Sequence, residues 1–344
     1  MKKYITVVIL ASLSWVPITH AGLLLTGQDS PELPEMGMAE ESTQLLGMSS
    51  GDAPAMSEQC LAFAKDPDAD LGEVLKAGCE PTLAQMSALM DNPLGNVAMW
   101  MNQYDSYHLK NDATGKEAIQ GNYMGILQFP TSVNEDWNLI NRVIYNVASA
   151  PLSQRKVDNL TNNPPGTPPG HINPGSQPAP LDLVKGRTTD FGDMYYVGLF
   201  SKKEPTYLDN GAKFVWGLGF DVGLPTAQED VLGTGKWTVG PSALAVYLGE
   251  KWKGGALLTN YWDFAGDSDR DDVRLSNLQY LYYYSLDETT SIGAGPNIII
   301  DWEQDGSDRF TVPVGLGINK TVNFGKLPIR FGFEAMYSAH RPDR

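Results

Sequence analysis

The sequence predicts an all-β fold: an antiparallel transmembrane β-barrel of the outer-membrane type, with about 12 strands, preceded by a small α-helical segment. Residues 211–224 alternate between apolar and small or polar side chains, which is the period of a β-strand. The run is longer than most strands of soluble proteins and suits a tilted strand that crosses a bilayer. Similar runs follow at 236–248 and 251–264, with aromatic residues near their ends.

The two faces of the predicted 211–224 strand differ sharply in character. The face expected to contact lipid carries Phe214, Trp216, Leu218, Phe220, Val222 and Leu224. The opposite face carries Val215, Gly217, Gly219, Asp221 and Gly223. Because an outer-membrane barrel turns its apolar side chains toward lipid, the second set is expected to face the lumen.

The same alternation predicts the other strands, and their connections predict which side of the membrane each loop occupies. The predicted strands are 96–109, 119–130, 136–147, 190–201, 211–224, 236–248, 251–264, 273–285, 289–302, 308–320 and 328–340. Short connections are assigned to the periplasm and long or strongly polar ones to the outer surface. The longest, 148–189, is rich in Pro and cannot pair in a sheet.

The first 56 residues are predicted to carry an export signal and a disordered segment. In residues 1–21, Lys2 and Lys3 precede an apolar run, and Ala21 ends a small-residue cleavage site, as in a signal peptide. A membrane anchor is the alternative, but the run is too short for a spanning helix. Residues 22–56 are rich in Glu, Ser, Met, Gly and Pro, which predicts disorder. The predicted location is therefore the outer membrane.

Residues 57–93 are predicted to form a helical unit that a disulfide braces, ahead of the barrel at 94–344. Cys60 and Cys79 are the only cysteines, and close cysteines in an exported chain are typical of a disulfide. Closing that loop would stabilise the segment by about 3 kcal/mol in the chain-entropy model. Zinc binding is the alternative, but two thiols without a nearby His or third Cys make a poor ligand set. The unit is placed at the periplasmic mouth, although it could also plug the lumen.

Five phrases carry a resemblance to a known family: EDWNLINRVI, GRTTDFGDMYYVGLFS, DVLGTGKWTVGPSALAV, NYWDFAGDSDRDDV and DRFTVPVGLGI. Over most of residues 92–344 the chain resembles the phenol-degradation meta-pathway family of bacterial outer-membrane barrels, whose members are often called transporters or, misleadingly, neuromedin U. The resemblance implies a channel for passive uptake of small, often apolar or aromatic compounds. It implies no catalytic residue, since none is established in the family.

The expected partners follow from this resemblance and from the charge. They are outer-membrane lipid and lipopolysaccharide, the barrel-assembly machinery and a small organic solute. Nucleic acid is not expected, because phosphate contact needs a basic surface and the formal net charge is −16. No cofactor or resident metal is expected.

Polar and charged residues on the predicted inward face are the candidate lumen residues. They are Arg142, Asn146, Asp221, Asp263, Asn297, Asp301, Arg309, Asn319, Arg330 and Glu334. A charge facing lipid at mid-membrane would cost about 2–4 kcal/mol, so these side chains are placed inward. They could select solutes along a permeation path. Alternatively, the three arginines could pair with the Asp and Glu carboxylates in a lumen filled by side chains.

The sequence also offers three other interpretations: calcium binding, lipid hydrolysis and a structural or adhesive role. The acidic loop 267–272 offers oxygen ligands for Ca²⁺, but a solvated loop is favoured because EF-hand spacing is missing. A lipid-hydrolysing barrel would use Ser and His, and His108, His171 and His340 are available. There is no G-x-S-x-G element, so the chain is predicted not to be an enzyme. A structural or adhesive barrel, with the Pro-rich loop as its working part, is the third interpretation.

The last expectation concerns the closure of the sheet. Bacterial single-chain barrels have an even number of strands, whereas the predicted strands number about eleven. Relatives in the family usually continue past the Arg341-Pro342-Asp343 motif into another strand. A closing strand is therefore predicted to be missing after Arg344. The 96–109 and 328–340 strands should then flank a gap one strand wide, about 10 Å.

Overall fold

The computed structural model describes residues 6–13, 57–65, 74, 77–95, 97–110, 117–151, 153, 186–325 and 327–342. The chain divides into two units, one formed by Met1–Trp15 with Leu83–Arg344 and the other by Val16–Thr82. The predicted disordered segment 22–56 lies outside the described residues, as does most of the Pro-rich 148–189 connection. No helix in the described part of the chain is both long enough and apolar enough to cross a membrane.

The larger unit is an antiparallel β-sheet, which confirms the all-β prediction. Its first strands are β1 (Thr6–Leu13), β2 (Met99–Lys110), β3 (Glu117–Ser132), β4 (Trp137–Ala150), β5 (Thr188–Phe191), β6 (Met194–Lys202), β7 (Thr206–Tyr207) and β8 (Lys213–Leu224). The next are β9 (Lys236–Leu248), β10 (Trp252–Gly266), β11 (Arg274–Ser285), β12 (Thr290–Ala294), β13 (Asn297–Asp301), β14 (Phe310–Phe324) and β15 (Leu327–His340). A helix, α3 (Leu83–Asp91), precedes β2, and the short 3-10 turns η1 (Asp230–Leu232) and η2 (Gly306–Arg309) lie in connections.

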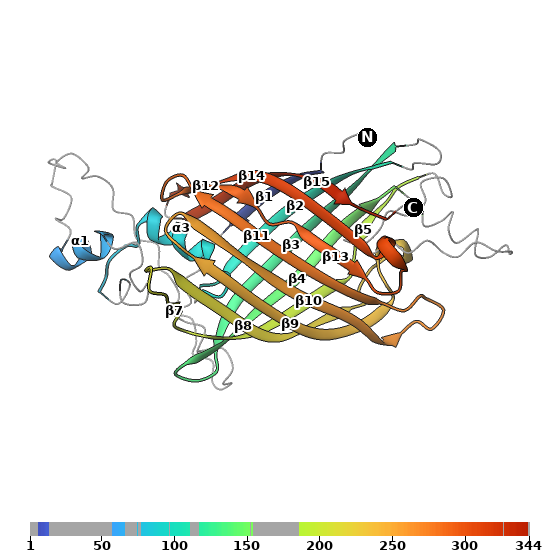
Figure 1. Ribbon diagram of the computed structural model, residues 1–344, viewed down its shortest axis with the longest axis horizontal. Coiled ribbons are helices and arrows are strands. Elements are labelled where there is room, and N and C mark those ends of the chain that lie inside the picture. The colour runs from blue at the N-terminus through green and yellow to red at the C-terminus, as the bar shows by residue number, and fades with distance from the viewer. Residues whose placement is uncertain are drawn as a thin grey trace, which may run out of the picture. The chain divides into compact units, whose positions relative to one another are not determined.

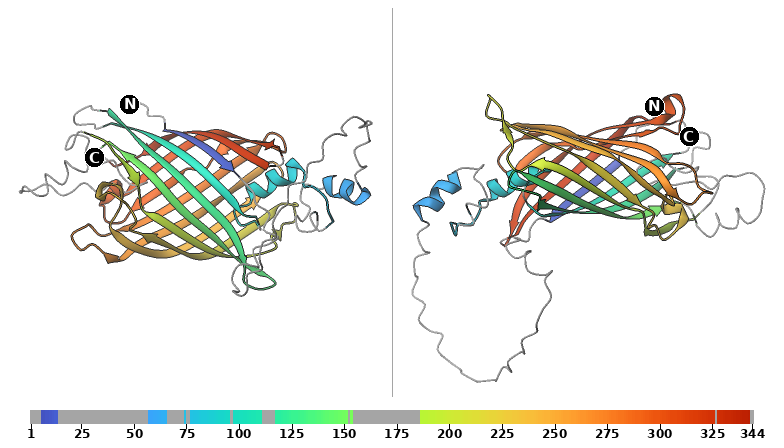
Figure 2. Two further views of the ribbon diagram at one scale, coloured as in Figure 1. Left: turned by 180° about the vertical axis from the view of Figure 1, so that it is seen from behind. Right: turned by 90° about the horizontal axis from the view of Figure 1, so that it is seen from below.

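Hydrogen-bonded neighbours define the order of the strands. The path runs β10-β9-β8-β6-β4-β3-β2-β1-β15-β14-β12-β11-β13, and β10 also pairs with β11. This extra pairing links β10, the first strand of the path, to β11, which is next to the last. Figures 1 and 2 show the strands lying side by side in a sheet that curls round on itself. Every predicted strand is present, but 190–201 is divided into β5 and β6, and 289–302 is divided into β12 and β13.

The N-terminal strand β1 occupies a position that the sequence did not predict. It pairs antiparallel with β15 on one side and with β2 on the other. β2 and β15, which correspond to the predicted 96–109 and 328–340 strands, are therefore separated by the width of one strand, as predicted. The expectation of a gap is wrong for this chain, because residues 6–13 fill the position and satisfy the backbone groups of both neighbours. These residues belong to the predicted signal peptide, whose removal stays a prediction.

The smaller unit contains the predicted disulfide and the helix α1 (Glu58–Lys65). Cys60 and Cys79 are joined, with their Cα atoms 5.4 Å apart. Val74 and Cys79 are both buried. Ser57 directly precedes α1, and its hydroxyl accepts a hydrogen bond from the backbone N–H of Cys60, as an N-cap does. The predicted helical unit 57–93 is thus split, because α3 belongs to the unit that contains the sheet.

Candidate functional site: the inner face of the sheet

The two faces of the sheet differ in the way the alternation predicted. Along β8, Val215, Gly217, Asp221 and Gly223 are buried, whereas Leu218 is 57% exposed. Here the face bearing Asp221 is called the inner face and the one bearing Leu218 the outer face. Large apolar side chains are exposed on the outer face of several strands, including Trp100, Leu127, Phe200, Phe220, Trp237, Trp252, Trp262, Leu316 and Phe333. An exposed apolar surface of this extent is unusual for a protein surrounded by water.

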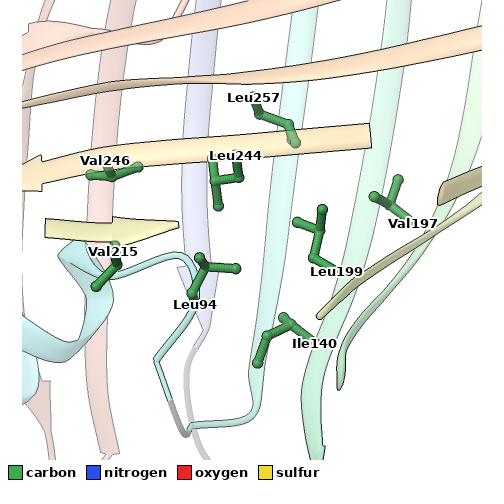
Figure 3. Packing of buried hydrophobic residues seen from close by; sticks show 8 residues of the cluster. All are labelled: Leu94, Ile140, Val197, Leu199, Val215, Leu244, Val246 and Leu257. Carbon is green, nitrogen blue, oxygen red and sulfur yellow. The ribbon is translucent and has the colours of Figure 1, made fainter. Parts of the chain in front are cut away.

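An apolar cluster covers part of the inner face. It consists of Leu94, Ile140, Val197, Leu199, Val215, Leu244, Val246 and Leu257. All except Leu94 come from the neighbouring strands β4, β6, β8, β9 and β10. Figure 3 shows Leu94 among these strand residues, on the segment that follows α3. Its Cδ1 atom lies 3.4 Å from the point where a Cβ on Gly217 would stand, so glycine leaves room for this contact.

A turn after α3 directs Leu94 into this cluster. The Asn92 Oδ1 atom accepts a hydrogen bond from the Leu94 N–H at 3.0 Å, and the Asn92 carbonyl accepts one from the Gly95 N–H at 3.0 Å. Asn, Pro and Gly at these places of Asn92-Pro93-Leu94-Gly95 are the residues that such a turn favours. This contact was not predicted, although the turn signal is present in the sequence.

The last residue of α3 is held by two cations from the sheet. Asp91 accepts hydrogen bonds from Lys253 of β10 and, at 2.6 Å, from Nη1 of Arg330 on β15. All three side chains are less than one-fifth exposed. Arg330, a predicted lumen residue, also donates to the carbonyl and hydroxyl of Ser87 and to Thr321. We call this set the α3 latch. It fixes α3 to the inner face near the first residues of β10 and β15.

Asp221 completes the sheet where a proline interrupts it. Pro241 has no N–H to donate, and residues 240–242 of β9 have no described partners on β10. There the Asp221 Oδ2 atom accepts hydrogen bonds from the Asn260 N–H at 3.0 Å and from the Ser242 hydroxyl at 2.5 Å. A Cβ on Gly240 would stand 1.7 Å from the Asn260 carbonyl oxygen, so this close approach requires glycine. Asp221 was predicted as a lumen charge, but its contacts also give it a structural role.

Glu334 has the same role at a second proline. Gly295 and Pro296 separate β12 from β13, which is why the predicted 289–302 strand is divided. The Glu334 carboxylate accepts a hydrogen bond from the Gly295 N–H at 3.1 Å and another from the Tyr283 hydroxyl at 2.9 Å. Both inward acids therefore satisfy donors that a regular ladder would have paired.

Arg142 also lies on the inner face, but its side chain does not take part in a comparable set of hydrogen bonds within the described residues. It is 9% exposed, and among the described residues its side chain makes no ion pair or hydrogen bond. In register beside it on β3 stands Gln128, which is 2% exposed and whose two side-chain polar atoms also lack described partners. The predicted alternative, in which arginines pair with Asp221, Asp301 and Glu334, is not found in the described residues.

The other predicted lumen residues are placed as follows. Asn146 and Asn319 are buried, and Asn146 donates to the carbonyl of Asp193 at 2.6 Å. Asp263 is 3.9 Å from the Lys236 ammonium and accepts from the Val273 N–H at 3.0 Å. Asn297 and Asp301 are the half-buried ends of β13. Arg309 was predicted to lie in a strand, but it lies in η2. There its side chain donates to the Gln304 carbonyl and stacks over Trp302.

At the opposite end of the strands from α3, the 225–235 connection folds back onto the inner face. Val231 and Leu232 of η1 pack against Ala148 and Ala150 of β4. Asp193 fixes this connection by accepting from the backbone N–H groups of Ala227 (3.1 Å) and Thr234 (2.6 Å). The inner face is thus covered by chain segments near both ends.

The residues considered for calcium binding and catalysis lie apart from the inner face. No cluster of potential metal ligands is found in the described residues, and the 267–272 loop is used locally, with Asp267 accepting from the Asp269 N–H. His108 is exposed and 3.6 Å from Glu117, and His340 contacts the Ser307 carbonyl at 2.7 Å. His171 lies outside the described residues.

In comparisons with known proteins, no protein-family model and no curated protein matches this chain.

Proposed function

We propose that the sheet closes as an outer-membrane β-barrel through which small organic solutes pass by diffusion. The observation that carries this proposal is the alternation of β8 and β14, in which buried inward residues alternate with exposed apolar ones such as Leu218 and Leu316. A bilayer would cover the exposed apolar face and favours strands of this length. The resemblance of the sequence phrases to a family of outer-membrane channels supports the same function.

The inner face suits solutes that are partly apolar. Its aliphatic cluster offers a surface for hydrocarbon, while buried polar side chains such as Arg142, Gln128 and Asn146 offer hydrogen bonds. Pathways that combine apolar walls with a few polar groups are typical of sites for small organic molecules. In this proposal α3 and Leu94 limit passage at one end, and the 225–235 connection limits it at the other.

Location, processing and assembly belong to the same proposal. Residues 1–21 would direct export and be removed, outer-membrane lipid and lipopolysaccharide would surround the barrel, and the assembly machinery would insert it. No specific observation favours a lipid-acting enzyme or an adhesive barrel over a channel.

The direct test is solute entry into phosphatidylcholine vesicles that contain the purified protein. We expect these vesicles to swell in an isosmotic solution of a small neutral sugar faster than vesicles without protein. Heat-denatured protein, added in the same amount, is the control for leakage. Equal swelling rates in all three preparations would contradict the channel function.

A further inference from the structure

Arg142 and Gln128 form a polar pair within an otherwise apolar part of the inner face. They stand opposite each other in the β3–β4 register. On its other side Arg142 is in register with Val197, and its inward neighbours along β4 are Ile140 and Ile144. The guanidinium therefore lies beside an amide on one side and aliphatic side chains on the others.

Within the described residues, the polar side-chain atoms of this pair are left without hydrogen-bond partners. The Arg142 Nε and both polar side-chain atoms of Gln128 are buried without a partner in the described part of the chain. A buried polar group, and above all a buried charge, is ordinarily matched by a hydrogen-bond partner. A permanently charged guanidinium in such a place is best matched by an anion, and its planar fork of donors fits a carboxylate.

An aromatic pair lies next to these donors. Tyr195, in register with Ile144, meets Tyr261 edge to face, with ring centroids 5.1 Å apart. Tyr261 is also close to both Arg142 and Asp221. Val197 separates Asp221 from Arg142 in the strand register; the Oδ2 atom of Asp221 is engaged by Ser242 and Asn260, and its Oδ1 atom has no partner in the described residues. The surroundings of Arg142 therefore combine one available cation with aliphatic and aromatic surface.

From this arrangement we propose that Arg142 and Gln128 form a specificity site for small monocarboxylates with an apolar body, of which benzoate is a representative. The carboxylate would accept hydrogen bonds from the guanidinium and the amide, and the apolar body would lie against the half-buried rings of Tyr195 and Tyr261. This inference rests on the proposed channel function, because the site lies on the inner face that solutes would follow.

The experiment compares benzoate with two neutral compounds: its analogue benzyl alcohol in binding, and a small sugar in transport. Binding is measured by calorimetry on the full chain in detergent micelles, and entry by flux into phosphatidylcholine vesicles. We expect saturable benzoate binding and preferential benzoate flux. Arg142→Gln should weaken benzoate binding by about tenfold or more, the effect of losing a charged hydrogen bond, and leave the flux of the sugar unchanged. Arg142→Lys should keep part of the preference.

The controls separate this inference from the proposed function. Arg309→Gln removes a cation from η2, away from the site, and should leave benzoate binding as in the wild type. Heat-modifiable electrophoretic mobility verifies that each variant is folded. Benzoate binding that depends on Arg142, without flux of any solute, would uphold the site and contradict the channel. Flux of both compounds without preference or dependence on Arg142 would uphold the channel and overturn the site.

Discussion

Asp91→Ala is expected to increase the open fraction of the proposed channel by about 100-fold, or until the channel is fully open. The substitution leaves Arg330 and Lys253 mostly buried without their shared carboxylate. Removing one partner of a buried ion pair costs about 3–5 kcal/mol, and 3 kcal/mol changes an equilibrium more than 100-fold. Because Asp91 is the last residue of α3, this cost should release the helix and withdraw Leu94 from the apolar cluster.

Planar-bilayer conductance measures this effect. Glu303→Gln is the matched control, since it disrupts a pair with Arg274 that is largely exposed, and such pairs contribute about 0–1 kcal/mol. Its conductance should equal that of the wild type. Limited proteolysis between α3 and β2 reports whether the helix has been released. An Asp91→Ala protein with a released helix and unchanged conductance would show that α3 does not limit passage.

Asp221→Ala is expected to lower the free energy of unfolding by about 3 kcal/mol or more. The change removes the acceptor of two buried hydrogen bonds, each contributing roughly 1–3 kcal/mol, and leaves the Asn260 N–H without a partner. That N–H has no acceptor in the ladder, because β9 and β10 are not paired at this point and the Pro241 carbonyl accepts from the Asn260 side-chain amide instead. The loss should therefore exceed the effect of removing an ordinary side chain from the inner face.

Urea unfolding in detergent micelles, followed by electrophoretic mobility, measures this free energy. Asp221→Asn keeps one acceptor oxygen and should lose less than half as much stability. Asn297→Ala, at the half-buried start of β13, should have little effect. Equal stability of Asp221→Ala and the wild type would contradict the structural role given to this carboxylate.

The sequence was sufficient to predict most of the sheet, because its signals are local. Alternation depends only on neighbouring residues, and it located β8, β9 and β10 and assigned Leu218 and Asp221 to opposite faces. The disulfide followed from two cysteines in an exported chain. The division of 289–302 could also have been predicted, since Pro296 cannot donate to a ladder.

The contacts between distant parts of the chain could not be predicted in this way. Nothing near Arg330 indicates that its partner is Asp91, 239 positions away in the sequence. The engagement of Asp221 by Asn260 depends on the register of three strands, which alternation alone does not determine. The pairing of residues 6–13 with β2 and β15 was missed because an apolar run of that length fits an export signal equally well.

The central claim is that the outer face of this sheet lies against lipid while the inner face does not. Spin labels attached to single cysteines, in a background with Cys60 and Cys79 replaced by serine, test it most directly. Leu218 and Leu316 are the outward positions, and Met124 and Gln279 are the inward ones. In reconstituted vesicles, oxygen dissolved in the bilayer should collide with the outward labels far more often than a water-soluble nickel chelate does, and the inward labels should not show this preference. Outward labels that collide more often with the nickel chelate would contradict the claim.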